Sequence, residues 1–243
     1  MHPSELEKYF REKLAHLDWQ SISETMHDQG FVILEKFFTE QQCNVIRNNY
    51  DHPFLYRKTV NMQQYRFGIG EYKYFSYPLP HLIQHLRTQI YCYLMPIANT
   101  WFKLLDLDTI FPETHQEFLE QCQQHGQMKA TPLILQYPKG GFNTLHQDLY
   151  GEIYFPIQLV IFLSQINTDY HGGEFVMTQQ IPRAQSKAIV LQPQKGDVLI
   201  FATQFKPEKG TRSYFRMTMK HGVSPLHQGE RYTLGIIFHD AVS

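Results

Sequence analysis

Residues 145–150 contain a histidine and a carboxylate two positions apart, His146 and Asp148, among residues typical of strands. In a β-strand, residues i and i+2 project from the same face, so these two side chains can reach one point in space. One distant histidine would complete a set of two imidazoles and one carboxylate, which leaves half of the positions of an octahedral metal free. This ligand set is typical of non-haem Fe(II) sites, and we predict such a site here.

The His-x-Asp spacing is not specific by itself, because the chain contains it a second time at His16 and Asp18. Those two residues fall in a helical pattern, where residues i and i+2 point about 200° apart and cannot face one metal ion. We therefore predict that His16 and Asp18 lie on a solvated helix face and that only the strand-like copy binds metal.

The third ligand is predicted to be His221. It ends a strand-like run 73 residues after Asp148, and the intervening sequence holds four further candidate strands, enough to return to the same mouth of a jelly roll. His171 and His227 fall in a predicted turn and a predicted loop, where side chains are usually exposed. His239 ends a strand and stays open as a contact to the metal ligands or to the substrate.

Arg231 indicates that the site also binds a cosubstrate with a carboxylate group. An iron enzyme of this type needs an electron-rich cosubstrate, and a dicarboxylic 2-oxo acid that binds the metal through one end needs a cation for the other. Arginine supplies a fork that matches a carboxylate. One face of the strand that begins at Arg231 is predicted to line the pocket, and it carries Arg231, Thr233, Gly235 and Ile237. The alternative, a surface arginine that starts a strand, stays open.

The elements that position these residues change character near residue 130. Before it, the apolar spacing predicts helices over residues 3–19, 21–30, 39–50, 80–105 and 112–126, and a buried strand over 31–34. Ser21 and Thr39 are predicted N-caps, Pro112 is predicted at the first turn of its helix, and Pro96 is expected to kink or end the fourth helix. The aromatic-rich segment 51–78 is open between a strand pair and a lid or substrate wall formed by its residues 65–77.

After residue 130 the apolar period shortens to about 2. Eight strands are predicted, over residues 131–137, 145–150, 156–164, 174–178, 187–192, 197–203, 213–224 and 231–239. Eight short strands after a helical first half predict an α+β fold with a double-stranded β-helix, or jelly roll. We predict a helical part over residues 1–130 that braces a jelly-roll core over residues 131–243, together forming one compact domain.

Composition argues against several function classes. Lys and Arg number 22 against 23 Asp and Glu, for a formal net charge of −1, and no basic run is present, so nucleic acid is not expected as a partner. Cys43, Cys92 and Cys122 are odd in number and lack a CxxC pair, which predicts neither a disulfide framework nor a thiolate zinc site. The polar N-terminus and the absence of an apolar run of ~18 residues predict neither signal peptide nor membrane span, so the expected location is the cytoplasm.

Together, His146, Asp148, His221 and Arg231 stand at spacings that resemble the 2-oxoglutarate/Fe(II)-dependent dioxygenases, and more narrowly their prolyl-4-hydroxylase-like branch. The resemblance covers about residues 131–240 and includes the Gly172-Gly173 turn. In that branch a tyrosine nine residues before the first histidine commonly contacts 2-oxoglutarate, and Tyr137 stands there. The prolyl hydroxylases usually carry lysine where this chain has Arg231.

The resemblance implies an Fe(II)- and 2-oxoglutarate-dependent dioxygenase that uses O2, with ascorbate as a candidate reductant, and releases succinate and CO2. It would hydroxylate an unactivated C–H bond. The expected substrate is a prolyl or other amino-acid residue in a peptide or protein, or a small molecule such as a free amino acid. Candidate pocket-wall residues are Tyr150, Tyr154, Phe155 and Gln158, with core packing as the alternative for the three aromatic residues. The alternatives are a non-enzymatic jelly roll that binds or senses a metal, and a nucleic-acid demethylase on the same fold. The oligomeric state stays open.

Overall fold

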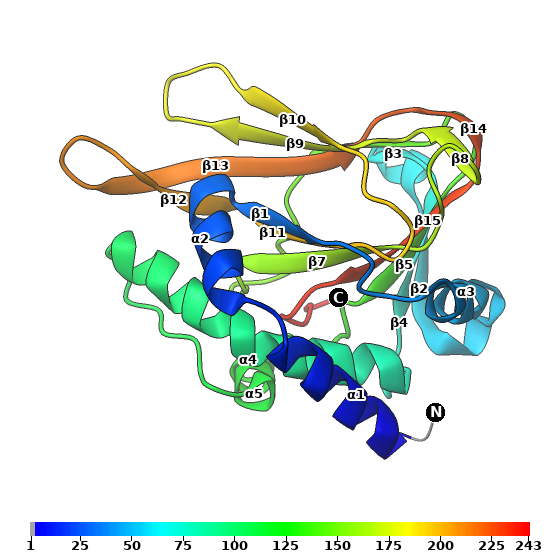
Figure 1. Cartoon of the computed structure of the whole chain (residues 1–243), viewed down its shortest axis with the longest axis horizontal. Coiled ribbons are helices and arrows are strands. Elements are labelled where there is room, and N and C mark those ends of the chain that lie inside the picture. The colour runs from blue at the N-terminus through cyan, green and yellow to red at the C-terminus, as the bar shows by residue number, and fades with distance from the viewer. Residues whose placement is uncertain (1–2) are drawn as a thin grey trace.

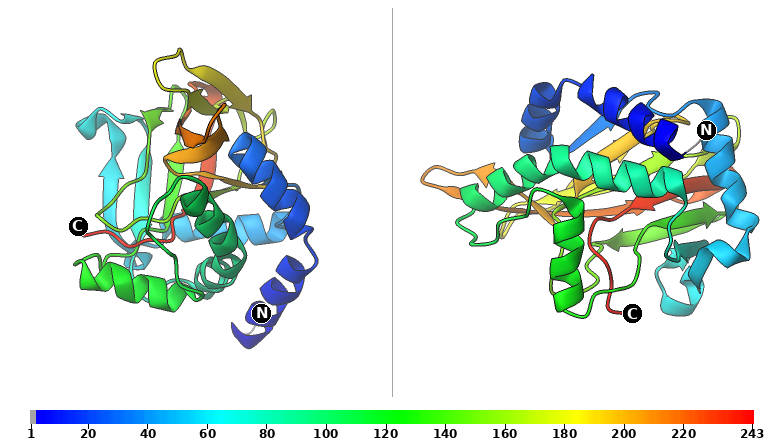
Figure 2. Two further views of the ribbon diagram at one scale, coloured as in Figure 1. Left: turned by 90° about the vertical axis from the view of Figure 1, so that its left-hand side faces the viewer. Right: turned by 90° about the horizontal axis from the view of Figure 1, so that it is seen from below.

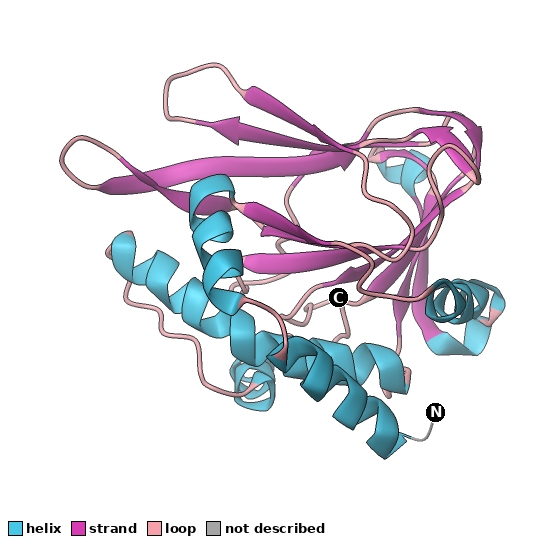
Figure 3. Ribbon diagram, viewed as in Figure 1, coloured by secondary structure: helices cyan, strands magenta, loops and turns pink. Residues whose placement is uncertain are grey.

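The computed structural model describes residues 3–243, which form two antiparallel sheets that face one another (Figures 1 and 3). The larger sheet has seven strands, in the spatial order β1 (Phe31–Leu34), β11 (Val198–Ala202), β7 (Ile157–Phe162), β15 (Arg231–Ile236), β5 (Leu133–Tyr137), β4 (Glu71–Phe75) and β2 (Tyr56–Asn61). The smaller sheet has six, which are β10 (Lys187–Leu191), β9 (Phe175–Gln180), β13 (Tyr214–Val223), β6 (Phe142–His146) and β3 (Gly68–Ile69), with β12 (Phe205–Lys209) paired to β13. A short pair, β14 (Leu226–Gly229) and β8 (Tyr170–Gly172), closes one end.

This arrangement confirms the predicted α+β jelly roll. The eight strands predicted after residue 130 correspond to β5, β6, β7, β9, β10, β11, β13 and β15. Only β6 is clearly displaced from its predicted range, because it ends at His146 rather than at residue 150. The sequence pattern missed β12 and the short β8 and β14.

Five α-helices brace the larger sheet, and Figure 2 shows α1, α4 and α5 on the side away from the smaller sheet. They are α1 (Pro3–Ala15), α2 (Trp19–Gln29), α3 (Glu40–Asn48), α4 (His81–Leu104) and α5 (His115–Gln124). The apolar stripe of α4, which includes Ile90, Leu94 and Trp101, is buried in one core with the inner strands β7, β11 and β15. Burial of this continuous stripe is what holds the helical layer on the sheet.

Two predicted helix starts are wrong. The N-cap of α2 is Asp18, whose carboxylate accepts a hydrogen bond from the Ser21 backbone N–H at 3.1 Å, so Ser21 lies inside the first turn. The N-cap of α5 is Thr114, with a capping box to Glu117, and Pro112 precedes the helix. In both cases a polar side chain that bonds the free backbone N–H groups marks the start better than the residue we favoured. Thr39 caps α3 as predicted.

Pro96 does not end α4. The helix is 24 residues long and continues past Pro96 to Leu104. A proline inside a helix leaves the carbonyl four residues earlier without its usual donor. Here that carbonyl belongs to Cys92, and both Cys92 and Pro96 lie on the exposed side, where water can satisfy it. The chain can therefore keep a long helix across the proline.

The aromatic segment forms strands. β2 and β4 extend the larger sheet through β5, and the connection between them crosses to the smaller sheet, where β3 pairs with β6. The strand-pair interpretation of residues 51–78 is therefore confirmed, and the first 130 residues are not helical throughout. All three cysteines are free, and no helix within residues 3–243 is long and apolar enough to cross a membrane.

Acid is expected to destabilise this helical layer through His115. Its Nε2 lies 2.9 Å from the Phe238 carbonyl, and burial, reinforced by the Arg87 charge, lowers the pKa of the imidazole from 6.5 to about 3. Between these two values the unfolded chain binds a proton that the folded chain does not, so the free energy of unfolding falls as the pH falls, by up to about 1.4 kcal/mol per pH unit. His115→Gln keeps a donor for the carbonyl and is expected to lose less stability than the wild type between about pH 7 and about pH 5 in urea titrations. Equal losses in the two proteins would contradict this role of His115.

Candidate metal centre

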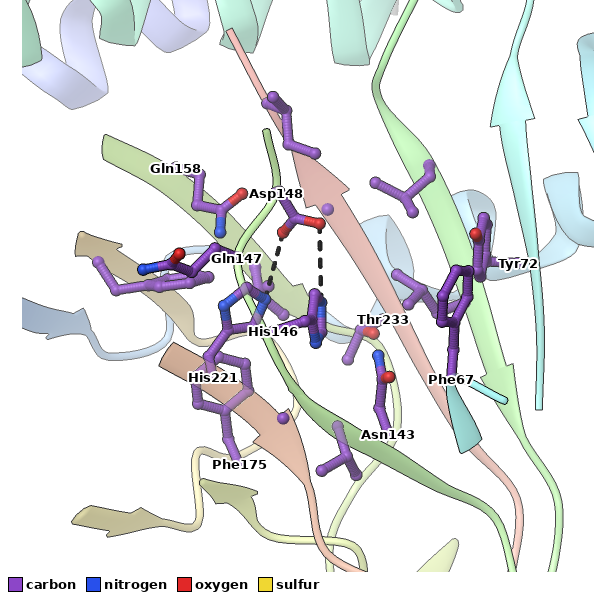
Figure 4. Close-up of a pocket in the computed structure, with 18 of the residues that line it drawn as sticks. Phe67, Tyr72, Asn143, His146, Gln147, Asp148, Gln158, Phe175, His221 and Thr233 are labelled. Atoms are coloured by element: carbon purple, nitrogen blue, oxygen red, sulfur yellow. Dashed lines mark ion pairs between the residues drawn. The ribbon is translucent and has the colours of Figure 1, made fainter. Parts of the chain in front are cut away.

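The structure brings the three predicted ligands together at the end of β6 and on β13. The Asp148 carboxylate lies 3.6 Å from His146 Nε2 through one oxygen and 3.2 Å from His221 Nε2 through the other (Figure 4). One ligand atom from each of these residues lies within 4.8 Å of the others, and they are the one such cluster of potential metal ligands within residues 3–243. Ligand atoms about 2.1 Å from one ion lie roughly 3 Å apart at right angles, so this spacing fits one divalent ion with little movement.

Strand pairing accounts for the two histidines. His146 and His221 are direct partners across β6 and β13, so their side chains project from one face of the smaller sheet. His221 is buried against the rings of Phe175 and Phe201, while His146 is partly exposed. The buried ring is fixed by packing, and the partly exposed ring lies on the open side of the centre.

Asp148 is not held by strand pairing, which corrects the predicted strand over residues 145–150. β6 ends at His146, and Asp148 lies in the irregular segment that follows. The side chain of Gln147 replaces the missing ladder bonds, since its Nε2 donates to the backbone carbonyls of Gln204 at 2.9 Å and Met219 at 2.8 Å. Met219 is two residues before His221 on β13, so this amide ties the carboxylate segment to the strand that carries the third ligand.

The electrostatics of the centre suit metal binding. Burial alone would raise the pKa of the Asp148 carboxyl, but His146, His221 and the Tyr150 hydroxyl together lower that pKa well below its ordinary value. The Tyr150 hydroxyl donates to Asp148 at 2.7 Å, and burial and the Asp148 charge raise the tyrosine pKa, which keeps it a donor. Burial, with His146 beside it, lowers the pKa of His221, so the imidazole is neutral. A charged carboxylate and a neutral imidazole are the forms that bind metal.

Arg231 lies in the pocket between the two sheets, at the first residue of β15. The side chain is buried, and its guanidinium carbon lies 5.4 Å from the Tyr137 ring centre and 5.3 Å from that of Phe162. The guanidinium hydrogen-bonds the Tyr170 hydroxyl, but its Nε and Nη2 have no hydrogen-bond partner, and no carboxylate pairs with it among residues 3–243. A buried cation without an anionic partner is costly, so this environment favours a bound anion. Tyr137 is its direct partner across β5 and β15, as the predicted shared site requires.

The pocket wall is partly as predicted. The face of β15 that was expected to line the pocket does so, with Arg231, Thr233, Gly235 and Ile237 all in its wall. Tyr150 and Gln158 also line the pocket. Tyr154 and Phe155 do not, because the Phe155 ring is buried between α4, α5 and Phe238 and Tyr154 packs near Phe102. For these two residues the pocket-wall interpretation was wrong and the alternative, packing away from the pocket, holds.

The other histidines take no part in the ligand set. His239 is buried, its Nδ1 accepts from the Phe155 backbone N–H at 3.1 Å, and burial lowers its pKa to about 3. His171 and His227 lie on β8 and β14, with exposed side chains. Phe67 and Tyr72, from the segment 65–77 that was open as a substrate wall, line the pocket, whereas sequence reasoning missed Leu133, Leu135, Asn143, Thr144 and Gln147. Gln147 was within reach of prediction as the residue between two ligands, but its partners are distant in sequence.

Gln147→Leu is expected to weaken divalent metal binding by about 10-fold to 100-fold, the range typical when a residue that orients a ligand is lost. The variant keeps the size of the side chain and loses both hydrogen bonds that hold the Asp148 segment. Isothermal titration calorimetry with Mn²⁺ measures the affinity. The control is Thr114→Ala, which removes the cap of α5 and costs about 1 kcal/mol of stability while leaving the centre intact. Equal metal affinities for the two variants would show that Gln147 acts only on stability.

Known proteins with similar sequences match most of the chain. The model of the Oxygenase-NA family, described as an oxygenase catalysing oxidative methylation of damaged DNA, matches residues 70–241. Two uncharacterized proteins of Mycobacterium tuberculosis, from strains CDC 1551 / Oshkosh and ATCC 25618 / H37Rv, are each 41% identical over 167 residues, which span 69% of this chain and 72% of each relative. The range 70–241 matched by the family model contains His146, Asp148, His221, Arg231 and Tyr137.

Solved structures share the fold at low identity. A Pseudomonas putida prolyl-4-hydroxylase aligns with a TM-score of 0.55 and 13% identity over 91% of this chain and 98% of its own. A Trichoplax adhaerens prolyl hydroxylase, solved with a hypoxia inducible factor peptide fragment, aligns with a TM-score of 0.57 and 14% identity over 98% and 91%. A 2OG-Fe(II) oxygenase family oxidoreductase of Burkholderia pseudomallei aligns with a TM-score of 0.54 and 14% identity over 94% and 95%. The resemblance inferred from four spaced residues is thus confirmed at the level of the fold.

Proposed function

Because the chain belongs to the Oxygenase-NA family, we propose that it is an Fe(II)- and 2-oxoglutarate-dependent oxygenase that inserts oxygen into a C–H bond of a damaged DNA base. The observation that carries the proposal is one pocket with two features. A ligand set of His146, Asp148 and His221 lies on one side of it, and the buried guanidinium of Arg231, whose Nε and Nη2 have no hydrogen-bond partner, lies in the same wall. Three protein ligands leave positions open for a substrate, whereas structural metal sites are normally closed by four. The metal-sensing alternative is therefore the weaker one.

Fe(II) would be held by the two imidazoles and the carboxylate, and it would supply O2 activation coupled to decarboxylation of 2-oxoglutarate to succinate and CO2. Asp148 would contribute the only negative charge of the ligand set. Arg231 would pair with the distal carboxylate of 2-oxoglutarate, and the Tyr137 hydroxyl, which accepts a hydrogen bond from Asn143 at 3.3 Å, would lie beside that pair. Apolar side chains around this region, among them Leu133, Leu135 and Val223, would exclude water.

The proposed substrate departs from the amino-acid residue expected from the sequence. The prolyl hydroxylases that share the fold are only 13% to 14% identical, so they support the architecture and not the substrate. The family description names damaged DNA instead. The near-neutral net charge, which spoke against nucleic acid, describes the whole chain and not the surface around the pocket.

The test is succinate release from protein loaded anaerobically with Fe(II) and then given 2-oxoglutarate and air, with and without ascorbate. Single-stranded oligonucleotides carrying methylated bases and proline-containing peptides are offered in parallel, and mass spectrometry follows the loss or oxidation of the methyl group or a gain of one oxygen. We expect succinate release that depends on the methylated oligonucleotide, and none from His221→Ala. Stimulation by the peptides alone would overturn the DNA assignment. No succinate under any condition would favour a metal-binding protein.

A further inference from the structure

Two exposed aromatic rings stand beside the pocket. The Tyr65 side chain is 55% exposed and that of Phe67 is 45% exposed, and the rings stack with centroids 5.6 Å apart and planes 18° from parallel. Phe67 lines the pocket near Tyr72, as Figure 4 shows. Large apolar rings that pack on each other and remain open to solvent cover no core, so their exposure calls for a partner.

The backbone holds these rings at a fixed place relative to the metal centre. The Phe67 carbonyl accepts hydrogen bonds from the backbone N–H and the hydroxyl of Thr144, at 2.8 and 2.9 Å. Thr144 is two residues before the ligand His146 on β6. On the other side, the Phe67 N–H donates to the carbonyl of Met62, which is fully buried. The rings are therefore exposed but not loosely attached.

Arg66, which separates Tyr65 from Phe67 in the sequence, adds a cation to this surface. Its backbone adopts a left-handed conformation, with φ of 60°, which lets Tyr65 and Phe67 lie on one side of the turn. The Arg66 side chain is exposed, and no carboxylate forms an ion pair with it within residues 3–243. Stacked aromatic rings next to a free cation are the surface that binds single-stranded nucleic acid, because every base has a flat face and every nucleotide a phosphate.

We propose that Tyr65, Arg66 and Phe67 form a base-stacking rim that holds a base of single-stranded DNA at the pocket, with Arg66 on an adjacent phosphate. This inference rests on the proposed function for the class of substrate. These three residues precede the range 70–241 that the family model matches, so the rim is a feature of this chain that the family match does not contain. It identifies the part of the pocket wall that would select a flat ring over a peptide.

The experiment uses a single-stranded oligonucleotide with 2-aminopurine next to a methylated base, because stacking on a ring quenches the fluorescence of 2-aminopurine. We expect wild-type protein to quench the probe, and Phe67→Leu and Tyr65→Leu each to weaken binding about 10-fold and reduce the quench at saturation. Phe67→Trp, which restores a flat ring, is expected to recover both. Arg66→Gln is expected to lower the salt dependence of binding by about one phosphate contact.

The matched control is Phe54→Leu. Phe54 is 77% exposed and does not line the pocket, so the same substitution there is expected to leave affinity and quench unchanged. Equal effects at Phe54 and Phe67, or wild-type quench in both rim variants, would overturn the proposal. The succinate assay on wild-type protein separates the two ideas. Turnover without any quench rejects the rim, and quench without any turnover rejects the oxygenase assignment while the rim stands.

Discussion

Replacing Asp148 with alanine is expected to abolish Fe(II)-dependent turnover and to weaken Fe(II) binding by more than about 100-fold, beyond the loss that follows removal of a supporting residue. Asp148 is the only carboxylate in the candidate ligand set, and each of its oxygens lies near a different histidine. Without it, two neutral imidazoles would have to hold a divalent cation in a partly buried site, and the Tyr150 hydroxyl would lose its acceptor. Both effects disfavour the metal-bound state.

The measurement is anaerobic Fe(II) titration, together with the visible absorption band that Fe(II) and 2-oxoglutarate give when both are bound. The chain provides its own control in the second His-x-Asp pair, since Asp18 caps α2 and lies outside the centre. Asp18→Ala is expected to cost about 1 kcal/mol of stability and to leave Fe(II) affinity unchanged. An Asp148→Ala protein that binds Fe(II) within tenfold of the wild type would remove the basis of the proposed centre.

The contrast between the two His-x-Asp pairs shows what local sequence can predict. Apolar periodicity was enough to discard His16 and Asp18 and to keep His146 and Asp148 as candidates, although the predicted elements were only partly right. His16 and Asp18 lie between α1 and α2, and Asp148 follows the end of β6. The same reasoning gave the jelly roll and the inward face of β15, because both depend on the alternation of side chains along one strand. These are properties that a few neighbouring residues determine.

The predictions about the site that were wrong depend on contacts between distant segments, unlike the two helix starts, where a neighbouring residue provides the cap. Asp148 was placed on a strand, but its position is set by the Gln147 amide, whose acceptors lie 57 and 72 residues away. Tyr154 and Phe155 were assigned to the pocket because they follow the ligands closely, yet the chain turns toward α4 and α5 before it reaches them. No local pattern encodes which distant carbonyl an amide will bind, so these features required the structure.

Replacing Arg231 with methionine is expected to raise the 2-oxoglutarate requirement by about 30-fold or more, since removing one partner of a buried charge pair costs about 2 to 5 kcal/mol. The same substitution is expected to leave the metal-free, ligand-free protein as stable as the wild type or up to a few kcal/mol more stable. The reason is that Nε and Nη2 of this buried guanidinium have no partner, so the ligand-free fold bears the cost of burying the charge. If Arg231 served only the stability of the fold, its replacement would instead lower the free energy of unfolding of the ligand-free protein.

Arg87 provides the comparison within the same molecule, because it is also a fully buried arginine. Its Nη2 lies 2.9 Å from an oxygen of Asp240, and it also donates to the carbonyls of Ile237 and Phe238. Arg87→Met is therefore expected to cost about 3 to 5 kcal/mol, since it leaves Asp240 buried without its cation. Urea unfolding of both variants, with and without 2-oxoglutarate and Mn²⁺, measures whether each substitution raises or lowers the free energy of unfolding. If Arg231→Met destabilises the ligand-free protein as Arg87→Met does, and 2-oxoglutarate still stabilises it, then Arg231 holds the fold and another group must bind the cosubstrate.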